Sequence, residues 1–463
     1  MFGRSGQNFK RDMSIIWLTV FQGIEARNLL RTDFFDILSR NNQLKIVLLV
    51  NSQSKKIHME KEFSRFNVVI EVVDSVESSA LSKIFSLLKY IFINTDRIRI
   101  RHRVAWSEGG NVFAYLIKRT LTLILANSWC RRVYRYLDYS LSNKRPIALF
   151  ERYPPSLFVS AHLFGETESS LVRQARKLGV KTIGVINSWD KLVSRGMIRT
   201  LPDHLIVHNE IIKDEAVCYA DMPVKEISVV GIPHYDYFFT STPRSRQALG
   251  DRVGMGLSPY LLFCPTGQFY SDSDQIILDK LIEFKKQGII PHDHRILVRY
   301  PPNDIVDINH SKYLVGDVFF YQPGIRFSVK RGIDWDMGRD DCLLLMDMLY
   351  WCEMVICPPS SVSVDAAIFD RPIINVKIPG DNRWSNKNIN LFYDSDHYKK
   401  LLSTDGVKVT NDFKELAEAI KKYLSDPSVC HEGRLRIVQE QCWRTDGLSG
   451  MRMAQVVLNL LDV

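Results

Sequence analysis

Residues 357–376 read CPPSSVSVDAAIFDRPIINV and place three serines within four positions, between an apolar run and a predicted helix. The free backbone N–H groups at the start of a helix attract anions, and serine hydroxyls can donate further hydrogen bonds. We therefore predict that Ser360 and Ser361 bind a phosphate group, with Ser363 close to that phosphate as the helix cap. A plain helix cap that binds no ligand is the alternative.

Two acid–base candidates follow predicted strands in the N-terminal half. Glu25 comes after the apolar run 14–20, in a loop that Arg27 makes electropositive, and His162 comes after the run 157–160. A carboxylate or an imidazole in such a loop can accept the proton of a substrate hydroxyl. We predict catalytic roles for Glu25 and His162 and a substrate-binding role for Arg27. Ordinary helix caps and surface ion pairs are the alternatives.

Three further residues fit the binding of a sugar-like substrate. Trp189 and Asp190 follow the run 182–186, where an indole could stack on a sugar ring and a carboxylate could accept hydrogen bonds from hydroxyls. A helix cap with a packing tryptophan is the alternative. His234 lies at the predicted junction of the two halves of the chain, and we assign it to the substrate as well.

The first two predicted strands of the C-terminal half also end in polar residues. Thr266 and Gly267 follow the run 260–264, and Arg299 follows the run 295–298. We expect Thr266 and Gly267 to line the cleft between the two halves, where the Arg299 guanidinium could bind an anion.

Short apolar runs alternate with helical patterns along most of the chain, which predicts βαβ units and parallel sheets. Ligands of such sheets bind at the carboxyl ends of the strands, so a cleft between two halves is the expected substrate site. The predicted strands are 14–20, 45–50, 68–73, 157–160, 182–186, 204–208 and 227–230 in one half and 260–264, 295–298, 318–321, 355–357 and 373–376 in the other.

The polar stretch 240–258 is the predicted linker. We expect an N-terminal Rossmann-like acceptor domain over 1–240, with a helical basic insert at about 78–143. A C-terminal Rossmann-like donor domain should cover 255–440, and a final helix within 441–463 should pack back on the first domain.

The chain has 463 residues and a net charge of +9, which favours an anionic partner such as a nucleotide phosphate, an anionic glycan or a membrane surface. The basic stretch 97–103 and the apolar run 112–126 could dock on an anionic membrane. Packing of these residues as a helical insert is the alternative. No nucleic-acid-binding module is recognisable, so we expect no nucleic acid partner.

The eight cysteines include no CxxC pair, which favours free thiols in a reducing compartment and argues against structural zinc. Residues 1–13 contain no apolar segment typical of a signal peptide. The run 112–126 is too short and too charged to span a bilayer. We expect a cytoplasmic protein, either free or peripheral on the inner face of the membrane.

Four segments in a fixed order resemble those of GT-B glycosyltransferases, above all the bacterial surface-polysaccharide enzymes that include teichoic-acid glycerophosphotransferases and sialyl- and Kdo-transferases. They are VVGIPHYD at 229–236, RILVRYPP at 295–302, the serine-rich segment at 357–376 and TDGLSGMRMAQVV at 445–457. The sequence departs from the family at Pro301, where the family has a histidine. The resemblance implies that Ser360 and Ser361 hold the phosphate of a nucleotide donor and that Thr266 and Gly267 line its cleft. The anion-binding role of the missing histidine would then fall on Arg299, or on His292 or His294.

The resemblance implies a GT-B fold and a glycosyltransferase that moves a sugar from a nucleotide donor to a surface polysaccharide or a lipid-linked glycan. It implies no cofactor beyond the nucleotide sugar and no metal, because the DxD letters at 334–336 fall in an irregular loop. The alternatives are a CDP-polyol phosphotransferase, a non-hydrolysing sugar-nucleotide 2-epimerase and an inactive GT-B-like scaffold, which Pro301 would fit.

Overall fold

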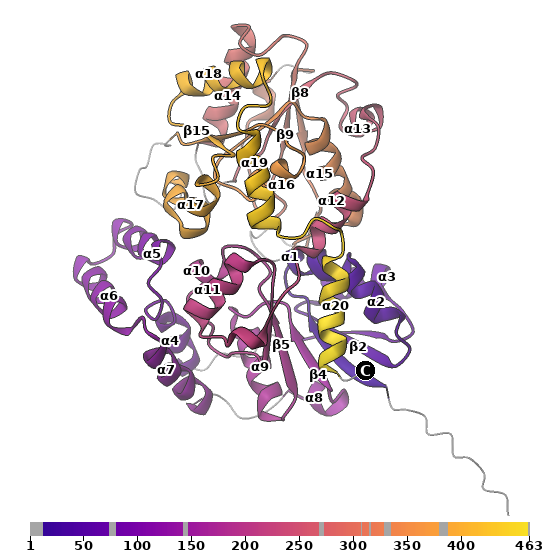
Figure 1. Ribbon diagram of the computed structural model, residues 1–463, viewed down its shortest axis with the longest axis vertical. Helices are drawn as coiled ribbons and strands as arrows, with labels where there is room; N and C mark the ends of the chain where they lie inside the picture. The colour runs from indigo at the N-terminus through magenta and orange to yellow at the C-terminus, as the bar shows by residue number, and fades with distance from the viewer. Residues whose placement is uncertain are drawn as a thin grey trace, which may run out of the picture.

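The computed structural model describes residues 13–73, 80–141, 147–267, 273–306, 308–313, 316–327, 335–378 and 388–461. The chain forms two α/β lobes stacked along the long axis of the molecule (Figure 1). Residues 1–12, on which the expectation about a signal peptide mainly depends, lie outside the described residues. None of the helices in the ranges given above is both long enough and apolar enough to cross a bilayer.

The first lobe contains a seven-stranded sheet in the order β3-β2-β1-β4-β5-β6-β7, and every neighbouring pair is parallel. Its central strands are buried because helices cover both faces, which explains their continuous apolar runs. The strands are β1 (Ser14–Thr19), β2 (Leu44–Val50), β3 (Val68–Val72), β4 (Leu157–Ser160), β5 (Lys181–Val185), β6 (His204–Val207) and β7 (Ile227–Val229).

The second lobe contains a six-stranded parallel sheet in the order β10-β9-β8-β13-β14-β15, and a separate two-stranded antiparallel ribbon, β11-β12. The strands are β8 (Tyr260–Phe263), β9 (Arg295–Arg299), β10 (Val318–Tyr321), β11 (Ile325–Arg326), β12 (Trp335–Asp336), β13 (Met354–Cys357), β14 (Ile373–Val376) and β15 (Lys408–Thr410). The prediction of two parallel-sheet domains is confirmed. The sequence pattern missed β15, which has only three residues.

Helices flank both sheets, and α4 to α7 form a separate group beside the first lobe (Figure 1). The helices of the first lobe are α1 (Gly23–Glu25), α2 (Asp33–Arg40), α3 (Gln53–Phe63), α4 (Ala80–Leu88), α5 (Asp96–Ser107), α6 (Val112–Leu125), α7 (Ser128–Leu141), α8 (Leu149–Arg152), α9 (Glu166–Lys177), α10 (Lys191–Ser194) and α11 (Glu210–Ala220). The next helix, α12 (Asp236–Thr240), lies at the junction and packs against the second lobe. Those that follow are α13 (Arg246–Val253), α14 (Asp274–Lys286), α15 (Arg339–Trp351), α16 (Val362–Ile368), α17 (Asp396–Leu402), α18 (Phe413–Ser425), α19 (His431–Ile437) and α20 (Ser449–Leu460).

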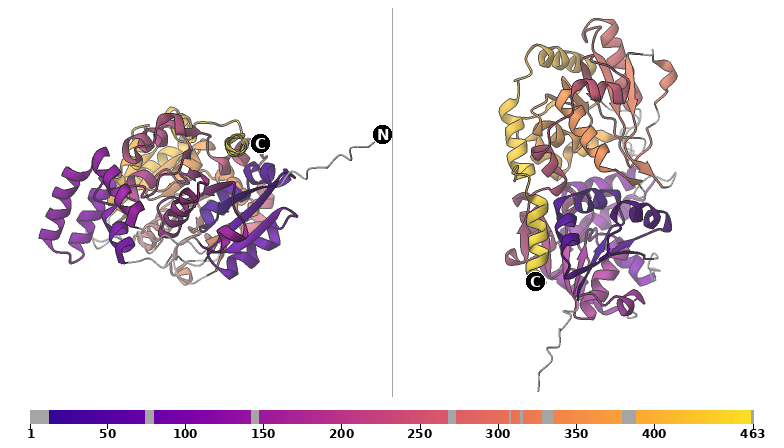
Figure 2. Two further views of the ribbon diagram at one scale, coloured as in Figure 1. Left: turned by 90° about the horizontal axis from the view of Figure 1, so that it is seen from below. Right: turned by 90° about the vertical axis from the view of Figure 1, so that its right-hand side faces the viewer.

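The segment between the sheets is more ordered than its composition suggested. The predicted linker at 240–258 contains α13, which the hydroxyl of Ser245 caps by accepting a hydrogen bond from the Ala248 N–H. The chain later returns to the first lobe, where α20 packs along α2 (Figure 2). The carboxylate of Asp236 accepts hydrogen bonds from the Ser449 and Gly450 N–H groups, at 3.0 and 2.7 Å, and so fixes the start of α20.

The strand order brings the loops that follow β1, β4, β8 and β13 to the place where the two lobes meet. In the first sheet the order reverses between β1 and β4, and in the second it reverses between β8 and β13. The loops that leave neighbouring parallel strands diverge at such a reversal and leave room for a ligand at the carboxyl edge. The topology therefore directs attention to the residues that follow β1 and β13, which include Arg27 and Ser361.

Candidate active site between the two domains

A cavity of about 100 Å³ lies between the lobes at the carboxyl edges of both sheets. The loops after β1, β5, β6 and β7 supply one side, and α16 supplies the other. The lining residues are Ile24, Arg27, Asn187, Ser188, Trp189, His208, Asn209, Ile212, Ile232, His234, Tyr235, Ser361, Val364, Asp365 and Gln441. Four of the predicted site residues, Arg27, Trp189, His234 and Ser361, therefore meet in one place.

Two arginines act on Asp365 in this cavity, and one of them, Arg27, lines it. The Nε of Arg27 donates to the Oδ1 of Asn28 at 3.3 Å. Arg299, at the end of β9, is only 5% exposed, and its Nε has no hydrogen-bond partner. Both positive charges act on the carboxyl of Asp365. No carboxylate in the described ranges lies within ion-pair distance of either guanidinium, so a bound anion would satisfy both.

Two neutral histidines face the same space. Burial, together with the charge of Arg27, lowers the pKa of His208 to about 4. Burial and the positive charge of Arg27 also hold the pKa of His234 well below its usual range. The Nδ1 of His234 is buried and has no hydrogen-bond partner. A neutral imidazole with a free nitrogen can accept a proton from a substrate hydroxyl.

Asp365 has a partner that the sequence did not suggest. The hydroxyl of Tyr235 donates to its Oδ1 at 2.5 Å and joins α16 to the segment between the domains. Burial raises the pKa of Asp365, against the effects of this hydrogen bond and of the charges of Arg27 and Arg299. Tyr235 thus fixes the Asp365 carboxyl in the cavity that Ser361 also lines.

The three predicted serines have different surroundings. α16 begins at Val362, so Ser361, and not Ser363, precedes it; the prediction of Ser363 as the cap is wrong. Ser361 is exposed and lines the cavity, while the Oγ of Ser360 accepts a hydrogen bond from the Val362 N–H at 3.3 Å. Ser363 is fully buried, and its hydroxyl bonds to Tyr398 and accepts from Asn375, which turns it away from a ligand.

Trp189 and Asp190 are neighbours in sequence but face different surroundings. The Trp189 ring lines the cavity and lies 4.9 Å from the ring of His397, edge to face. Asp190 instead accepts hydrogen bonds from the hydroxyls of Ser188 and Ser194, at 2.7 and 3.0 Å. Burial would raise the pKa of Asp190, but nearby positive charges, chiefly that of Lys191, outweigh burial and hold the pKa low. Asp190 thus holds the loop that presents Trp189.

The two predicted bases do not line the cavity. Glu25 is fully buried, and its Oε2 accepts hydrogen bonds from the Phe21 and Gln22 N–H groups, at 2.6 and 3.1 Å. It therefore closes the turn after β1, and burial and the charge of Glu168 raise its pKa to about 8. His162 is buried against Phe164, with ring centroids 5.5 Å apart. The geometry places His234, and not these two residues, beside the cavity.

Thr266 and Gly267 are held by their own domain. Both N–H groups donate to the carboxylate of Asp274 at the start of α14, at 3.3 and 2.8 Å. Burial raises the pKa of Asp274 to about 6. Gly267 has φ +94 and a Cβ there would lie 2.7 Å from Asp304, so only glycine fits this turn. Neither residue lines the cavity.

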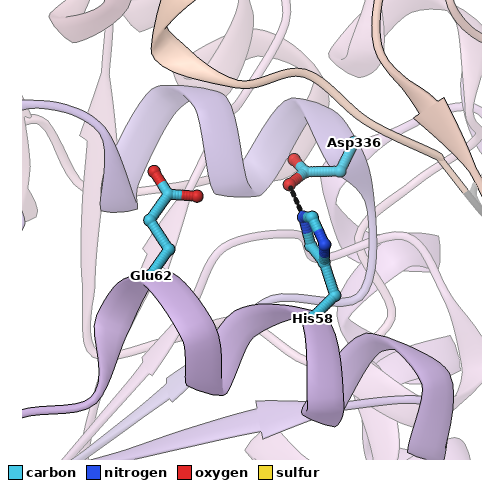
Figure 3. Close-up of side chains that lie close together, drawn as sticks. All are labelled: His58, Glu62 and Asp336. Carbon is cyan, nitrogen blue, oxygen red and sulfur yellow. Dashed lines mark hydrogen bonds and ion pairs between the residues drawn. The ribbon is translucent and has the colours of Figure 1, made fainter.

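A cluster of His58, Glu62 and Asp336 has the residue types of a metal site, and their nearest ligand atoms lie within 4.8 Å of one another (Figure 3). Arg31 already interacts with both carboxylates, at 2.5 Å from Asp336 and 2.7 Å from Glu62. The Arg31 guanidinium thus supplies the positive charge that a metal ion would bring to these two carboxylates. Asp336 is the final aspartate of the DxD letters, while Asp334 lies outside the described residues.

The polar residues of the cavity to which sequence reasoning gave no role include His208, Asn209 and Gln441. His208 and Asn209 directly follow β6, so the rule that found Arg299 would have found them too. Gln441 carried no such signal, because it belongs to a π-helical turn near the C-terminus.

No protein-family model matches the sequence, and no curated protein does either. Similar solved structures include a putative UDP-N-acetylglucosamine 2-epimerase from Listeria monocytogenes, with TM-score 0.57, 10% identity and 97% of each chain covered. A second is the S. aureus MnaA–UDP complex, with TM-score 0.55, 10% identity and 97% of each chain covered. A third is the Neisseria meningitidis UDP-GlcNAc 2-epimerase bound to UDP-GlcNAc, with TM-score 0.54 and 9% identity over 96% of this chain and 100% of that chain. The chain therefore has the two-domain GT-B fold that its sequence motifs predicted.

Proposed function

We propose that this protein is a glycosyltransferase that binds a nucleotide-activated sugar between its two domains and transfers the sugar to a glycan or lipid-linked glycan, in contact with the cytoplasmic membrane. The observation that carries the proposal is the buried guanidinium of Arg299, whose Nε has no hydrogen-bond partner and whose charge acts on Asp365 in the cavity that Arg27 lines. A nucleotide diphosphate supplies the anion that these charges lack. The UDP and UDP-GlcNAc complexes of proteins with the same fold support this choice of ligand.

The cavity also offers groups for the transfer itself. The departing nucleotide carries developing negative charge, which the guanidinium groups of Arg27 and Arg299 would stabilise. Trp189 provides an aromatic face for a sugar, and the neutral imidazole of His234 can take the proton of the acceptor hydroxyl. Binding of a diphosphate would neutralise Arg27, remove one cause of the low His234 pKa and make this imidazole a stronger base.

The first test is calorimetry with UDP-, CDP-, CMP- and GDP-linked sugars. We expect one class to bind, and Arg299→Gln to weaken that binding by at least about tenfold, as for loss of a charged hydrogen bond. Arg295→Gln is the matched control, because Arg295 begins the same strand and pairs with Asp317 instead. His234→Gln should retain donor binding and lose transfer. Absence of binding by any donor would overturn the proposal.

A 2-epimerase is the second candidate, since UDP-GlcNAc 2-epimerases are among the similar structures and the cavity places His208 and His234 beside Asp365. An epimerase acts on a sugar nucleotide without any acceptor. Incubation of the bound donor alone in D₂O, followed by NMR, separates the two activities. Deuterium at C2 with inversion there favours the epimerase, whereas an unchanged donor that is consumed only with an acceptor favours the transferase.

A further inference from the structure

The helices α4 to α7 carry an unusual concentration of exposed apolar side chains. They stand beside the first lobe, outside its sheet, in both Figure 1 and Figure 2. More than half of the large hydrophobic side chains that are exposed in the described part of the chain belong to residues 80–141. We call residues 80–141 the helical arm.

Within the arm, most apolar side chains of α6 are exposed, whereas a surface helix of a globular protein normally buries them. Thr122 is buried and Arg119 is half-buried, whereas Phe113, Ile117 and Ile124 are 70%, 59% and 62% exposed. An amphipathic surface helix normally turns its apolar stripe toward the core. In α6, Arg119 and Thr122 face the protein, whereas most of the apolar side chains are exposed together with Lys118, so this apolar face has no partner in the described part of the chain.

The neighbouring helices extend this surface. On α7, Trp129, Val133 and Tyr136 recur at helical spacing and are exposed, with Trp129 and Tyr136 each 71% exposed. On α4, Leu81 and Ile84 are 48% and 51% exposed. Tryptophan and tyrosine are the aromatic side chains that favour the boundary between lipid headgroups and acyl chains.

The charge of the arm identifies the partner. Residues 80–141 contain eleven Lys and Arg residues and three Asp and Glu residues, a net charge of +8 in a chain whose total is +9. Lys83, Arg103, Lys118 and Arg132 are exposed. None of these four has a carboxylate within ion-pair distance in the described part of the chain. An apolar surface with so strong a positive charge complements an anionic bilayer.

We infer that the helical arm binds the surface of an anionic membrane, with α6 lying in the plane of the interface. The apolar side chains of α6 enter the headgroup region, and the surrounding lysines and arginines pair with lipid phosphates. This inference concerns a surface outside the sugar-nucleotide cavity and does not depend on the proposed reaction.

Vesicle co-sedimentation of the full chain tests the inference without any donor. We expect binding to phosphatidylcholine vesicles that contain phosphatidylglycerol, little binding to phosphatidylcholine alone, and weaker binding as salt is added. The apolar triple variant Phe113→Ser, Ile117→Ser, Ile124→Ser and the charge triple variant Arg103→Gln, Lys118→Gln, Arg132→Gln should each lower the partition coefficient, the latter by roughly a hundredfold.

The chain offers matched controls for both variants. Phe66→Ser, Leu178→Ser, Leu257→Ser removes three apolar side chains that are 78%, 51% and 59% exposed outside the arm. Lys408→Gln, Lys414→Gln, Lys421→Gln removes three exposed charges of the second domain. Both controls should bind vesicles as the unmodified chain does, and circular dichroism should show that every variant is folded.

Two results would overturn the inference. One is a chain that does not bind anionic vesicles, or whose binding neither triple variant in the arm reduces. The other is a dimer, seen by analytical ultracentrifugation, that the apolar triple variant dissociates without any loss of vesicle binding. In that case a second copy of the chain covers the face.

Discussion

Glu25 carries a pH dependence of stability that follows from its burial. Its pKa of about 8 in the folded protein lies above the ordinary 4.5. Between these two values the folded state retains a proton that the unfolded state releases. The contribution of Glu25 to the free energy of unfolding is therefore fully present below about pH 4.5 and falls as the pH rises toward about 8.

We expect Glu25→Gln to lose this dependence, because the glutamine amide can still accept the Phe21 and Gln22 N–H hydrogen bonds and does not ionise. Urea unfolding at pH 5 and pH 8 measures it: the variant should gain stability relative to the unmodified chain on going to pH 8. Glu210→Gln, at an exposed carboxylate that pairs with Lys213, is the control. If the free energy of unfolding changed equally in both variants between pH 5 and pH 8, burial would not raise the pKa of Glu25.

At the scale of the element, the serines at the start of α16 have different surroundings, because Ser361 is exposed at the cavity and Ser363 is buried in the core. Ser361→Ala should leave the free energy of unfolding within about 0.5 kcal/mol, as for other exposed positions. It should weaken donor binding by roughly tenfold if the hydroxyl meets a phosphate. Calorimetry and urea unfolding on the same sample give both quantities.

Ser363→Ala serves as the opposite case on the same helix. Its hydroxyl joins a buried network with Asn375 and Tyr398, so its removal should cost about 1–3 kcal/mol of stability. Donor affinity, measured well below the melting temperature, should remain. A Ser361→Ala variant with full donor affinity would remove this serine from the site, and a Ser363→Ala variant of full stability would contradict the buried network.

At the scale of the whole molecule, an ion pair joins the two domains. Arg31 of the first domain and Asp336 of the second are 3% and 1% exposed and lie 305 residues apart in sequence. Trp335 also packs on the turn after β1, where a Cβ at Gly23 would lie 2.4 Å from its carbonyl oxygen. Both contacts cross the domain boundary.

Asp336→Ala should therefore cost about 1.5–3 kcal/mol, because Arg31 loses its charged hydrogen bonds across the domain boundary but keeps Glu62. We expect a wider distribution of domain separations by small-angle scattering, and weaker donor binding. Glu62→Gln is the control, since Glu62 is more exposed and pairs with Arg31 within one domain; it should cost no more than about 1 kcal/mol. Equal scattering curves for the two variants would show that the pair does not hold the domains.

Local sequence determined the strands, since each central strand is a short apolar run that only a sheet covered on both faces can bury. It also placed Arg27, Trp189 and Arg299 after strands, where polar residues collect at one edge of a parallel sheet, and His234 at the domain junction.

Only the tertiary structure decided which of those residues share a cavity. Whether Glu25 or Ser363 meets a ligand depends on what buries it, and their neighbours include Glu168 and Tyr398, far away in the chain. The same holds for Asp365, whose partner Tyr235 is 130 residues distant. The residue type determines which chemistry a side chain can perform. Its burial, its pKa and its access to substrate depend on contacts with residues that are distant in the sequence.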